Sequence, residues 1–114
     1  MNIEGKVWGS TRPLLQTPAI EIHEINIDLG GFCSTHAHQS KINAFYVLEG
    51  ELIIKRHKEY GLIDETHLFM GDMCVVPAGE KHSFEACQET KALEIYWAEL
   101  NFNDIIRDNV GGVV

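Results

Sequence analysis

Two glycine-bounded segments bring three histidines together and constrain the fold more than any other feature of this 114-residue chain. The first segment spans residues 30–50 and contains His36 and His38. Side chains alternate between the two faces of a strand, so histidines two residues apart point to the same side. The second segment spans residues 71–86, and its Pro-x-Gly turn lies just before His82. Because such a turn joins strands, His82 can reach the other two histidines from a second hairpin.

The rest of the chain predicts short strands separated by turns, with no repeat, linker or low-complexity stretch. Glu49-Gly50 separates two apolar runs and is typical of a hairpin turn. A phase change in the alternation near Glu24 indicates a bulge. Strands at this spacing predict an all-β sandwich or barrel, with helical character only at Asn103 to Asp108. The expected strands cover residues 20–29, 44–48, 51–55, 62–69, 73–76, 82–86 and 92–100.

The two segments resemble the two sequence motifs of the cupin superfamily. The first cupin motif, G-x5-H-x-H-x3,4-E-x6-G, is matched over 30–50 except that Asn43 replaces the glutamate. The second, G-x5-P-x-G-x2-H-x3-N, is matched over 71–86 except that Ala86 replaces the final asparagine. This resemblance implies one cupin domain over residues 1–114, folded as a jelly-roll barrel (a double-stranded β-helix) with a short C-terminal helical turn.

The three histidines predict a metal site. Neutral imidazoles that face one cavity suit a divalent ion such as Zn, Fe, Mn or Ni. Asn43 stands where cupins usually place a carboxylate ligand, and its amide is a weak or water-mediated ligand or a purely structural group. Gln39 is a less favoured oxygen donor. The predicted metal ligands are therefore His36, His38 and His82, with Asn43 as a weak fourth.

A finer resemblance points to the C-terminal cupin domain of type II mannose-6-phosphate isomerases. It rests on Val7-Trp8-Gly9-Ser10 before the barrel, on Ala92-Leu93-Glu94-Ile95, and on Asn103-Asp104-Ile105-Ile106-Arg107 near the end. The resemblance implies a metal-dependent aldose–ketose isomerase that acts on a sugar phosphate.

The residue that would move the proton is left unassigned by the sequence. Isomerisation needs a base, and the missing motif glutamate removes the obvious one. Glu94 and Glu49 are candidates, although a solvated face or pairing with lysine is the expected placement for both. The candidates for a phosphate contact at the rim, each of which is more often a solvated charge, are Lys41, Lys81, Arg56 and Arg107.

Two other functions stay open. Three histidines without a carboxylate also resemble the iron site of cupin thiol dioxygenases. Alternatively, the barrel is a non-enzymatic sensor or storage module for a small ligand, which the replacements Asn43 and Ala86 favour. Iron with oxygen consumption would distinguish the dioxygenase, and tight ligand binding without turnover would indicate the sensor.

Composition narrows the partners and the compartment. A formal net charge of -8 argues against nucleic-acid binding, which needs a basic face. No apolar run approaches the roughly 18 residues of a membrane span, and the N-terminus lacks the regions of a signal peptide. Three cysteines without C-x-x-C spacing favour a reducing cytoplasm. The expected partners are a small-molecule ligand and a second copy of the chain in a homodimer, with no nucleic acid and no membrane.

Alternation also predicts which side chains face the interior. If Asn43 points inward, Phe45 and Val47 follow it, and Phe84 follows His82. The same counting places Cys33 on the side away from His36 and His38. The aromatic residues expected to fill the barrel are Phe45, Tyr46, Phe69, Phe84 and Trp97. His57 and His67 are expected at the surface.

Overall fold

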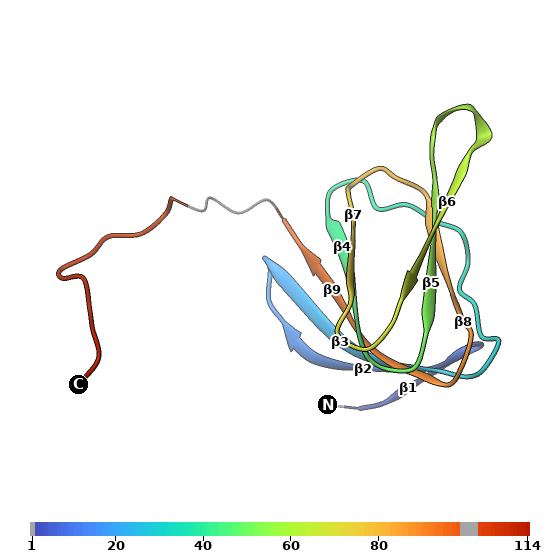
Figure 1. Cartoon of the computed structure of the whole chain (residues 1–114), viewed down its shortest axis with the longest axis horizontal. Helices are drawn as coiled ribbons and strands as arrows, with labels where there is room; N and C mark the ends of the chain where they lie inside the picture. Colours follow the sequence, from blue (N-terminus) through green and yellow to red (C-terminus); the bar gives the residue numbers. More distant parts are fainter. Residues whose placement is uncertain (1, 99–102) are drawn as a thin grey trace.

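The computed structural model describes residues 2–98 and 103–114, which form two β-sheets. One sheet has the strand order β1-β2-β3-β9-β4-β7 and the other has the order β6-β5-β8. Figure 1 shows the two sheets opposite each other, with the β5–β6 hairpin extending beyond the barrel. The strands are β1 (Glu4–Lys6), β2 (Gly9–Gln16), β3 (Ile20–Ile27), β4 (Ile42–Glu49), β5 (Leu52–His57), β6 (Ile63–Leu68), β7 (Met73–Val76), β8 (His82–Ala86) and β9 (Thr90–Trp97).

The all-β jelly-roll prediction is confirmed, and most expected strands lie where alternation placed them. The hairpin at Glu49-Gly50 joins β4 to β5, and Gly50 has a positive φ of 94°. A Cβ at this position would lie 2.4 Å from the carbonyl oxygen of Glu89, so only glycine fits the turn. The expected end of the last strand, at residues 99 and 100, lies outside the described residues.

A buried apolar core fills the barrel between the sheets. Ile25, Val47, Leu52 and Ile54 are fully buried, and Phe45 is 1% exposed. Burying a side chain of this size contributes about 1.5–3 kcal/mol to folding. The core therefore lies at the level where β3, β4 and β5 present aliphatic side chains.

The interior changes from apolar to polar along three neighbouring strands. The register pairs Ala92 of β9 with Ile25 and Val47, which are apolar. Two residues further along β9, Glu94 pairs with His23 of β3 and with Phe45 of β4. Paired residues of an antiparallel sheet project to the same face, so these rows line one interior. A last row pairs Tyr96 with Glu21 and Asn43.

This gradient explains why the predicted bulge near Glu24 is wrong. The register of β3 against β9 is continuous from Ile20 to Ile27, and the inward residues at its first end are Glu21 and His23. Because these inward residues are polar, the apolar–polar alternation of the sequence reverses here although the strand contains no bulge. The register shift in this part of the sheet lies instead in β2, between Pro13 and Leu15.

The predicted C-terminal helical turn is also wrong. Residues 103–114 contain no helix, and Figure 1 shows this part of the chain extending away from the barrel. An isolated helix of about six residues is unstable in water without packing. The only helical piece in the described ranges is the 3-10 turn η1 (Glu59–Gly61) in the β5–β6 hairpin. No helix in those ranges has the length and apolar character needed to cross a membrane.

The aromatic predictions are partly confirmed. Phe45 and Phe84 are buried and lie with ring centroids 5.9 Å apart. Tyr46 alternates with Phe45 and is only partly buried, and Phe69 is largely exposed. Trp8, which was not among the predicted residues, packs against the core, and its ring lies edge-on to that of Phe84 with the centroids 5.1 Å apart.

Candidate metal centre

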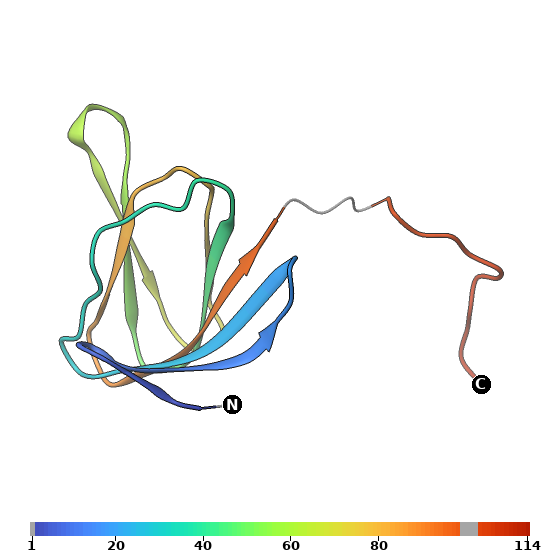
Figure 2. The same cartoon turned by 180° about the vertical axis from the view of Figure 1, so that it is seen from behind.

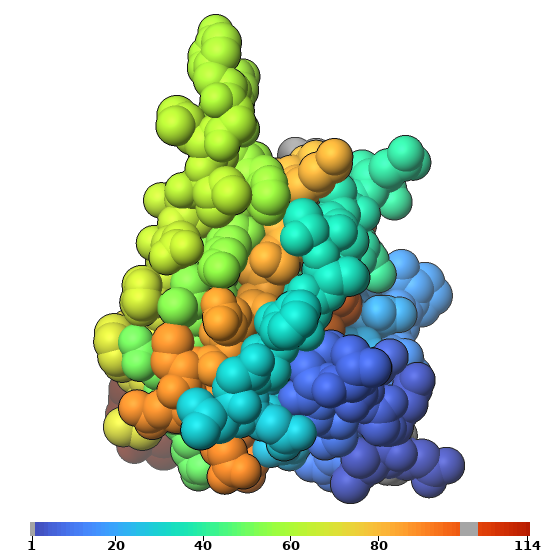
Figure 3. Space-filling view, turned by 90° about the vertical axis from the view of Figure 1, so that its right-hand side faces the viewer, coloured from blue at the N-terminus to red at the C-terminus, as the bar shows by residue number. Residues whose placement is uncertain are grey.

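The segment of residues 31–38 crosses the open side of the barrel beside β8. Figure 2 shows it as a loop between the two sheets, and Figure 3 shows it lying between the N-terminal strands and β8. The backbone N–H of Cys33 donates to the carbonyl of Phe84, and His36 exchanges both backbone hydrogen bonds with His82. Three residues on this segment therefore span two on β8, which is the geometry of a β-bulge.

The bulge corrects the predicted direction of Cys33. Ser34 and Thr35 are both exposed, so the alternation is broken between Cys33 and His36. Cys33 consequently turns inward and packs against the core, where its Sγ accepts a hydrogen bond from the N–H of Phe84 at 3.2 Å. Burial raises the pKa of the Cys33 thiol to about 11, which makes it an unreactive core residue.

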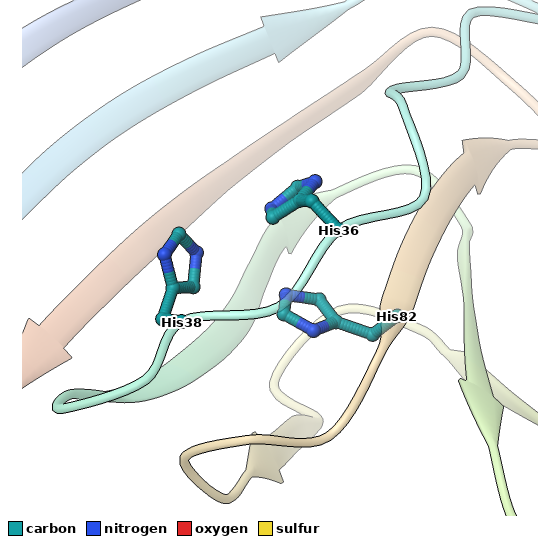
Figure 4. A group of neighbouring side chains, drawn as sticks. All are labelled: His36, His38 and His82. Carbon is teal, nitrogen blue, oxygen red and sulfur yellow. The ribbon is translucent and has the colours of Figure 1, made fainter.

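His36, His38 and His82 come together as the sequence predicts. One ligand atom from each lies within 4.8 Å of those of the other two, so the group could hold a metal ion. The ring centroids are 5.0 Å apart for His36 and His38, and 4.8 Å apart for His36 and His82. Figure 4 shows two of the rings rising from the 31–38 segment and the third from β8 into one space.

Hydrogen bonds to the backbone leave one nitrogen of His36 free for a ligand. Nδ1 of His36 lies 2.8 Å from the carbonyl oxygen of Ser34, so it carries the proton and donates. A neutral imidazole has one N–H, and Nε2 therefore keeps its lone pair. The buried Nε2 of His38 has no hydrogen-bond partner among the described residues. Because burying a polar atom without a partner is costly, this nitrogen fits a site that a metal completes.

His82 and Asn43 present two lone pairs to the same space. Nδ1 of His82 donates to the carbonyl of Glu80 at 2.9 Å, so its Nε2 is left without a proton. That Nε2 lies 3.0 Å from Oδ1 of Asn43, whose amide is fixed because its Nδ2 donates to the carbonyl of Ile95. Burial lowers the pKa of His82, which disfavours a proton between the two atoms. A cation would relieve this contact, and about 3 Å is the separation of two ligands that are bound at about 2.1 Å with an angle of about 90° between them at the metal.

A carboxylate inside the barrel stands beside the histidines. Glu94 was expected on a solvated face or paired with lysine, and that expectation is wrong because its row of β9 faces the core. Its carboxylate accepts a hydrogen bond from the hydroxyl of Tyr96 and is close enough to feel the charges of His23 and His36. Burial raises the pKa of Glu94, and it also raises the pKa of Tyr96, which keeps that hydroxyl a neutral donor.

The remaining candidates lie outside the three-histidine group, although Arg56 pairs with His82 in the register of β5 and β8. Glu49 is exposed in its turn, and Gln39 is exposed beside His38. His67 is exposed and contacts Glu51 at 3.2 Å, whereas His57 is only partly buried at the end of β5. Arg56 pairs with Glu80, and Lys81 and Arg107 are exposed. Lys41 is the predicted rim cation that lies at the site, with its Nζ 4.0 Å from the centroid of the Tyr96 ring.

Sequence reasoning missed His23 and Tyr96, which line the same interior as Glu94. The rings of His23 and Tyr96 lie 6.1 Å apart, and the ring of Tyr96 lies 5.1 Å from that of His38. Counting back in steps of two from the apolar pair Ile25 and Ile27 would have placed His23 inside. The apolar residues Ile20 and Ile22 in the opposite phase concealed this signal.

Comparison with known proteins supports the architecture. The sequence pattern of the cupin domain family matches residues 23–99. Among curated proteins, none matches the chain. KdgF from Halomonas sp. is similar in structure, with a TM-score of 0.76 and 16% sequence identity over 89% of each chain.

Two further solved structures share the fold. The cupin domain of Cnp3 from Schizosaccharomyces pombe has a TM-score of 0.74 at 12% identity, over 87% of this chain and 69% of that one. An oxalate decarboxylase variant from Bacillus subtilis has a TM-score of 0.75 at 16% identity, over 85% of this chain and 27% of that one. At these identities, the likeness shows the fold alone.

Proposed function

The chain belongs to the cupin domain family, and on that premise we propose that it is a metal-dependent enzyme that interconverts the aldose and ketose forms of a small sugar phosphate. The observation that carries the proposal is the carboxylate of Glu94 inside the barrel beside three convergent histidines. Moving a proton on the carbon beside a carbonyl requires a base and a group that polarises the carbonyl, and a carboxylate next to a metal site provides both.

The proposed metal ligands are Nε2 of His36, His38 and His82, together with Oδ1 of Asn43. Backbone carbonyls fix the protonation of His36 and His82, and Nε2 of His38 lacks another partner among the described residues. All four donors are neutral, so a bound divalent ion keeps its full charge. Such an ion supplies Lewis acidity that polarises the substrate carbonyl.

Glu94 is the proposed base. Its carboxylate takes the proton from C2 of the aldose, and the electron pair of that C–H bond forms the C1–C2 double bond. Returning the same proton to C1, while the proton on the C2 oxygen moves to the C1 oxygen, completes the ketose. Tyr96 donates to the carboxylate and so orients it. The raised pKa of Glu94 makes it a stronger base than an exposed carboxylate.

Deuterium exchange tests this function directly. The protein, fully loaded with Zn, Mn, Fe or Ni in turn, is incubated in D2O with a panel of aldose and ketose phosphates, and NMR follows deuterium at C1 and C2. Glu94→Gln should lower the exchange rate by about 10²–10⁴-fold, while Glu49→Gln, in an exposed turn, should match the parent. Absence of exchange with every substrate and metal would reject the isomerase, and undiminished exchange in Glu94→Gln would reject this base.

An iron-dependent dioxygenase is the second candidate, favoured by the absence of a carboxylate from the histidine group in the described residues. Iron in the purified protein, with oxygen consumption in the presence of thiols, would favour it over the isomerase. Zinc without oxygen consumption would exclude it. Tight ligand binding without turnover in either assay would favour a sensor. For the compartment we propose the reducing cytoplasm, since Cys33, Cys74 and Cys87 are free thiols.

A further inference from the structure

We propose that Lys41 forms an anion-binding subsite at the mouth of the barrel, so that the substrate is an anionic hydroxy-carbonyl compound held by its phosphate or carboxylate group. The inference rests on the proposed function, because it places that group beside the same histidines and the same base. It adds a residue that selects the substrate class.

A depression at the mouth of the barrel holds Lys41 and is bordered by Tyr96, whose ring contacts a histidine of the candidate metal centre. Its floor and walls include Glu21, Ser40, Lys41, Tyr96 and Trp97, at the ends of β3 and β9. Nζ of Lys41 lies 4.0 Å from the centroid of the Tyr96 ring, and the same ring lies 5.1 Å from that of His38 and 6.1 Å from that of His23. One aromatic ring therefore separates the lysine from a histidine of the candidate metal group.

The charge of Lys41 is available to a ligand. No carboxylate in the described part of the chain forms an ion pair with it, whereas Arg12, Lys55, Arg56 and Lys58 each have one. A cation over an aromatic ring is held in place without being neutralised.

The one carboxylate of the depression does not occupy the lysine. Oε2 of Glu21 lies 3.5 Å from Nε2 of His23, and its ion pair is with that histidine rather than with Lys41. The hydroxyl of Ser40 adds a neutral hydrogen-bond donor beside Lys41. In a chain with a formal net charge of -8, an unpaired cation at the mouth is where an anion is attracted rather than repelled.

The position of Lys41 sets the orientation of the substrate. An anionic group on the lysine leaves the rest of a small molecule pointing past Tyr96 toward His38 and Glu94. A neutral sugar of the same size loses this charge-assisted contact, which is stronger than a neutral hydrogen bond. The subsite therefore selects sugar phosphates or sugar acids over neutral sugars.

Titration with simple anions tests the subsite without requiring turnover. The zinc-loaded protein is titrated with inorganic phosphate in one series and with acetate in another, and NMR follows the ring resonances of Tyr96 and the side chain of Lys41. We expect saturable shifts with at least one ion. Tighter phosphate binding would indicate a phosphorylated substrate, and tighter acetate binding would indicate a sugar acid.

Matched variants separate the lysine from the metal. Lys41→Gln should weaken anion binding by about tenfold or more, while Lys41→Arg should keep it within roughly threefold. Lys91→Gln, at the opposite end of β9, should bind like the parent. Equal binding in Lys41→Gln and the parent, or no saturable binding of either ion, would overturn the subsite.

The test also separates this inference from the isomerase. Metal content and circular dichroism of each variant establish that the fold and the histidine group are intact. Lysine-dependent anion binding without deuterium exchange would reject the isomerase and keep the subsite. Exchange of phosphorylated and neutral sugars at equal rates would keep the isomerase and reject the subsite.

Discussion

Arg56 forms an ion pair with the carboxylate of Glu80, and the backbone carbonyl of the same Glu80 accepts the hydrogen bond from Nδ1 of His82. A second contact joins Nη2 of Arg56 to Oε2 of Glu80 at 3.3 Å, and Lys58 approaches the same carboxylate at 3.1 Å. This ion pair therefore joins the loop that precedes β8 to β5, together with the backbone hydrogen bond from the N–H of His57 to the carbonyl of Lys81. This fastening fixes both the direction of the His82 ring and the nitrogen that stays unprotonated.

Glu80→Gln should therefore weaken metal binding although residue 80 is not a ligand. Losing the charge-assisted contact leaves the loop held by backbone hydrogen bonds alone. Changes to groups that orient metal ligands typically cost about 10–100-fold in affinity. Competition with a chromogenic chelator measures the dissociation constant. Glu85→Gln is the matched control and should bind metal like the parent, because it removes the ion pair between Glu85 of β8 and Lys55 of β5. Equal affinity in both variants would show that the Arg56 pair does not act on His82.

The same pair should make stability depend on acid pH. The hydrogen bond from Arg56 holds the pKa of Glu80 below its usual value of 4.5. Its stabilisation is therefore complete above about pH 4.5 and is lost as the pH falls through the lower folded-state value. Urea unfolding should find Glu80→Gln less stable by about 1.5–3 kcal/mol at pH 7, and the difference should shrink toward pH 3. A constant difference at both pH values would contradict this assignment.

His82→Ala should abolish stoichiometric metal binding. It removes one of three imidazoles whose free nitrogens converge, and two histidines on the 31–38 segment leave an incomplete site. Elemental analysis of untagged protein, purified without added metal and again after reloading, gives the stoichiometry. His67→Ala, exposed on β6, should retain the metal. A parent protein without metal after reloading would mean that the barrel is only a scaffold.

Asn43 should affect metal binding and folding in separable ways. Asn43→Asp places a negative charge against the metal, so it should raise affinity for divalent ions. Asn43→Ala should lower affinity, and it should also destabilise the fold by about 1–3 kcal/mol because the buried carbonyl of Ile95 loses its donor. Chelator competition and urea unfolding report the two effects. Unchanged metal affinity in both variants would leave Asn43 a purely structural amide.

The sequence predicts the three histidines well because turns and strand alternation govern them locally. Pro77 and Gly79 precede His82 in the predicted way, and Asn43, Phe45 and Val47 follow one another into the interior at a period of two. These relations need no knowledge of which strands pair. The predicted direction of the Cys33 side chain was wrong because the bulge depends on hydrogen bonds to β8, and the local sequence does not reveal those hydrogen bonds.

The position of Glu94, the proposed base, could not be predicted for a similar reason. Whether Glu94 faces the core depends on the register of β9 between β3 and β4, where it pairs with His23 and Phe45. A glutamate between Leu93 and Ile95 is equally compatible with a strand whose two apolar residues face the core and whose glutamate faces water. The apolar neighbours lie instead on the outer face, so the hydrophobic pattern indicated the wrong side.

That outer face bears on the predicted homodimer. Ile95 pairs with Ile22 on one side and with Ala44 on the other, and Val75 of β7 pairs with Ala44. Ile22 and Ile95 are only partly buried and Val75 is 44% exposed, whereas the small Ala44 between them is fully buried. Apolar residues therefore lie on the outside of the large sheet on β3, β9 and β7. Adjoining apolar residues on an exposed sheet face are typical of protein–protein contacts.

We expect this face to be covered by a second copy of the chain. Light scattering after size-exclusion chromatography should give the mass of a dimer at micromolar concentration. Val75→Asp should shift the protein to a monomer, because each dimer would bury two uncompensated carboxylates. Leu62→Asp, at an exposed position near the tip of the β5–β6 hairpin, should remain dimeric. A monomeric parent, or a dimer that persists in Val75→Asp, would show that the sheet face is not the dimer interface.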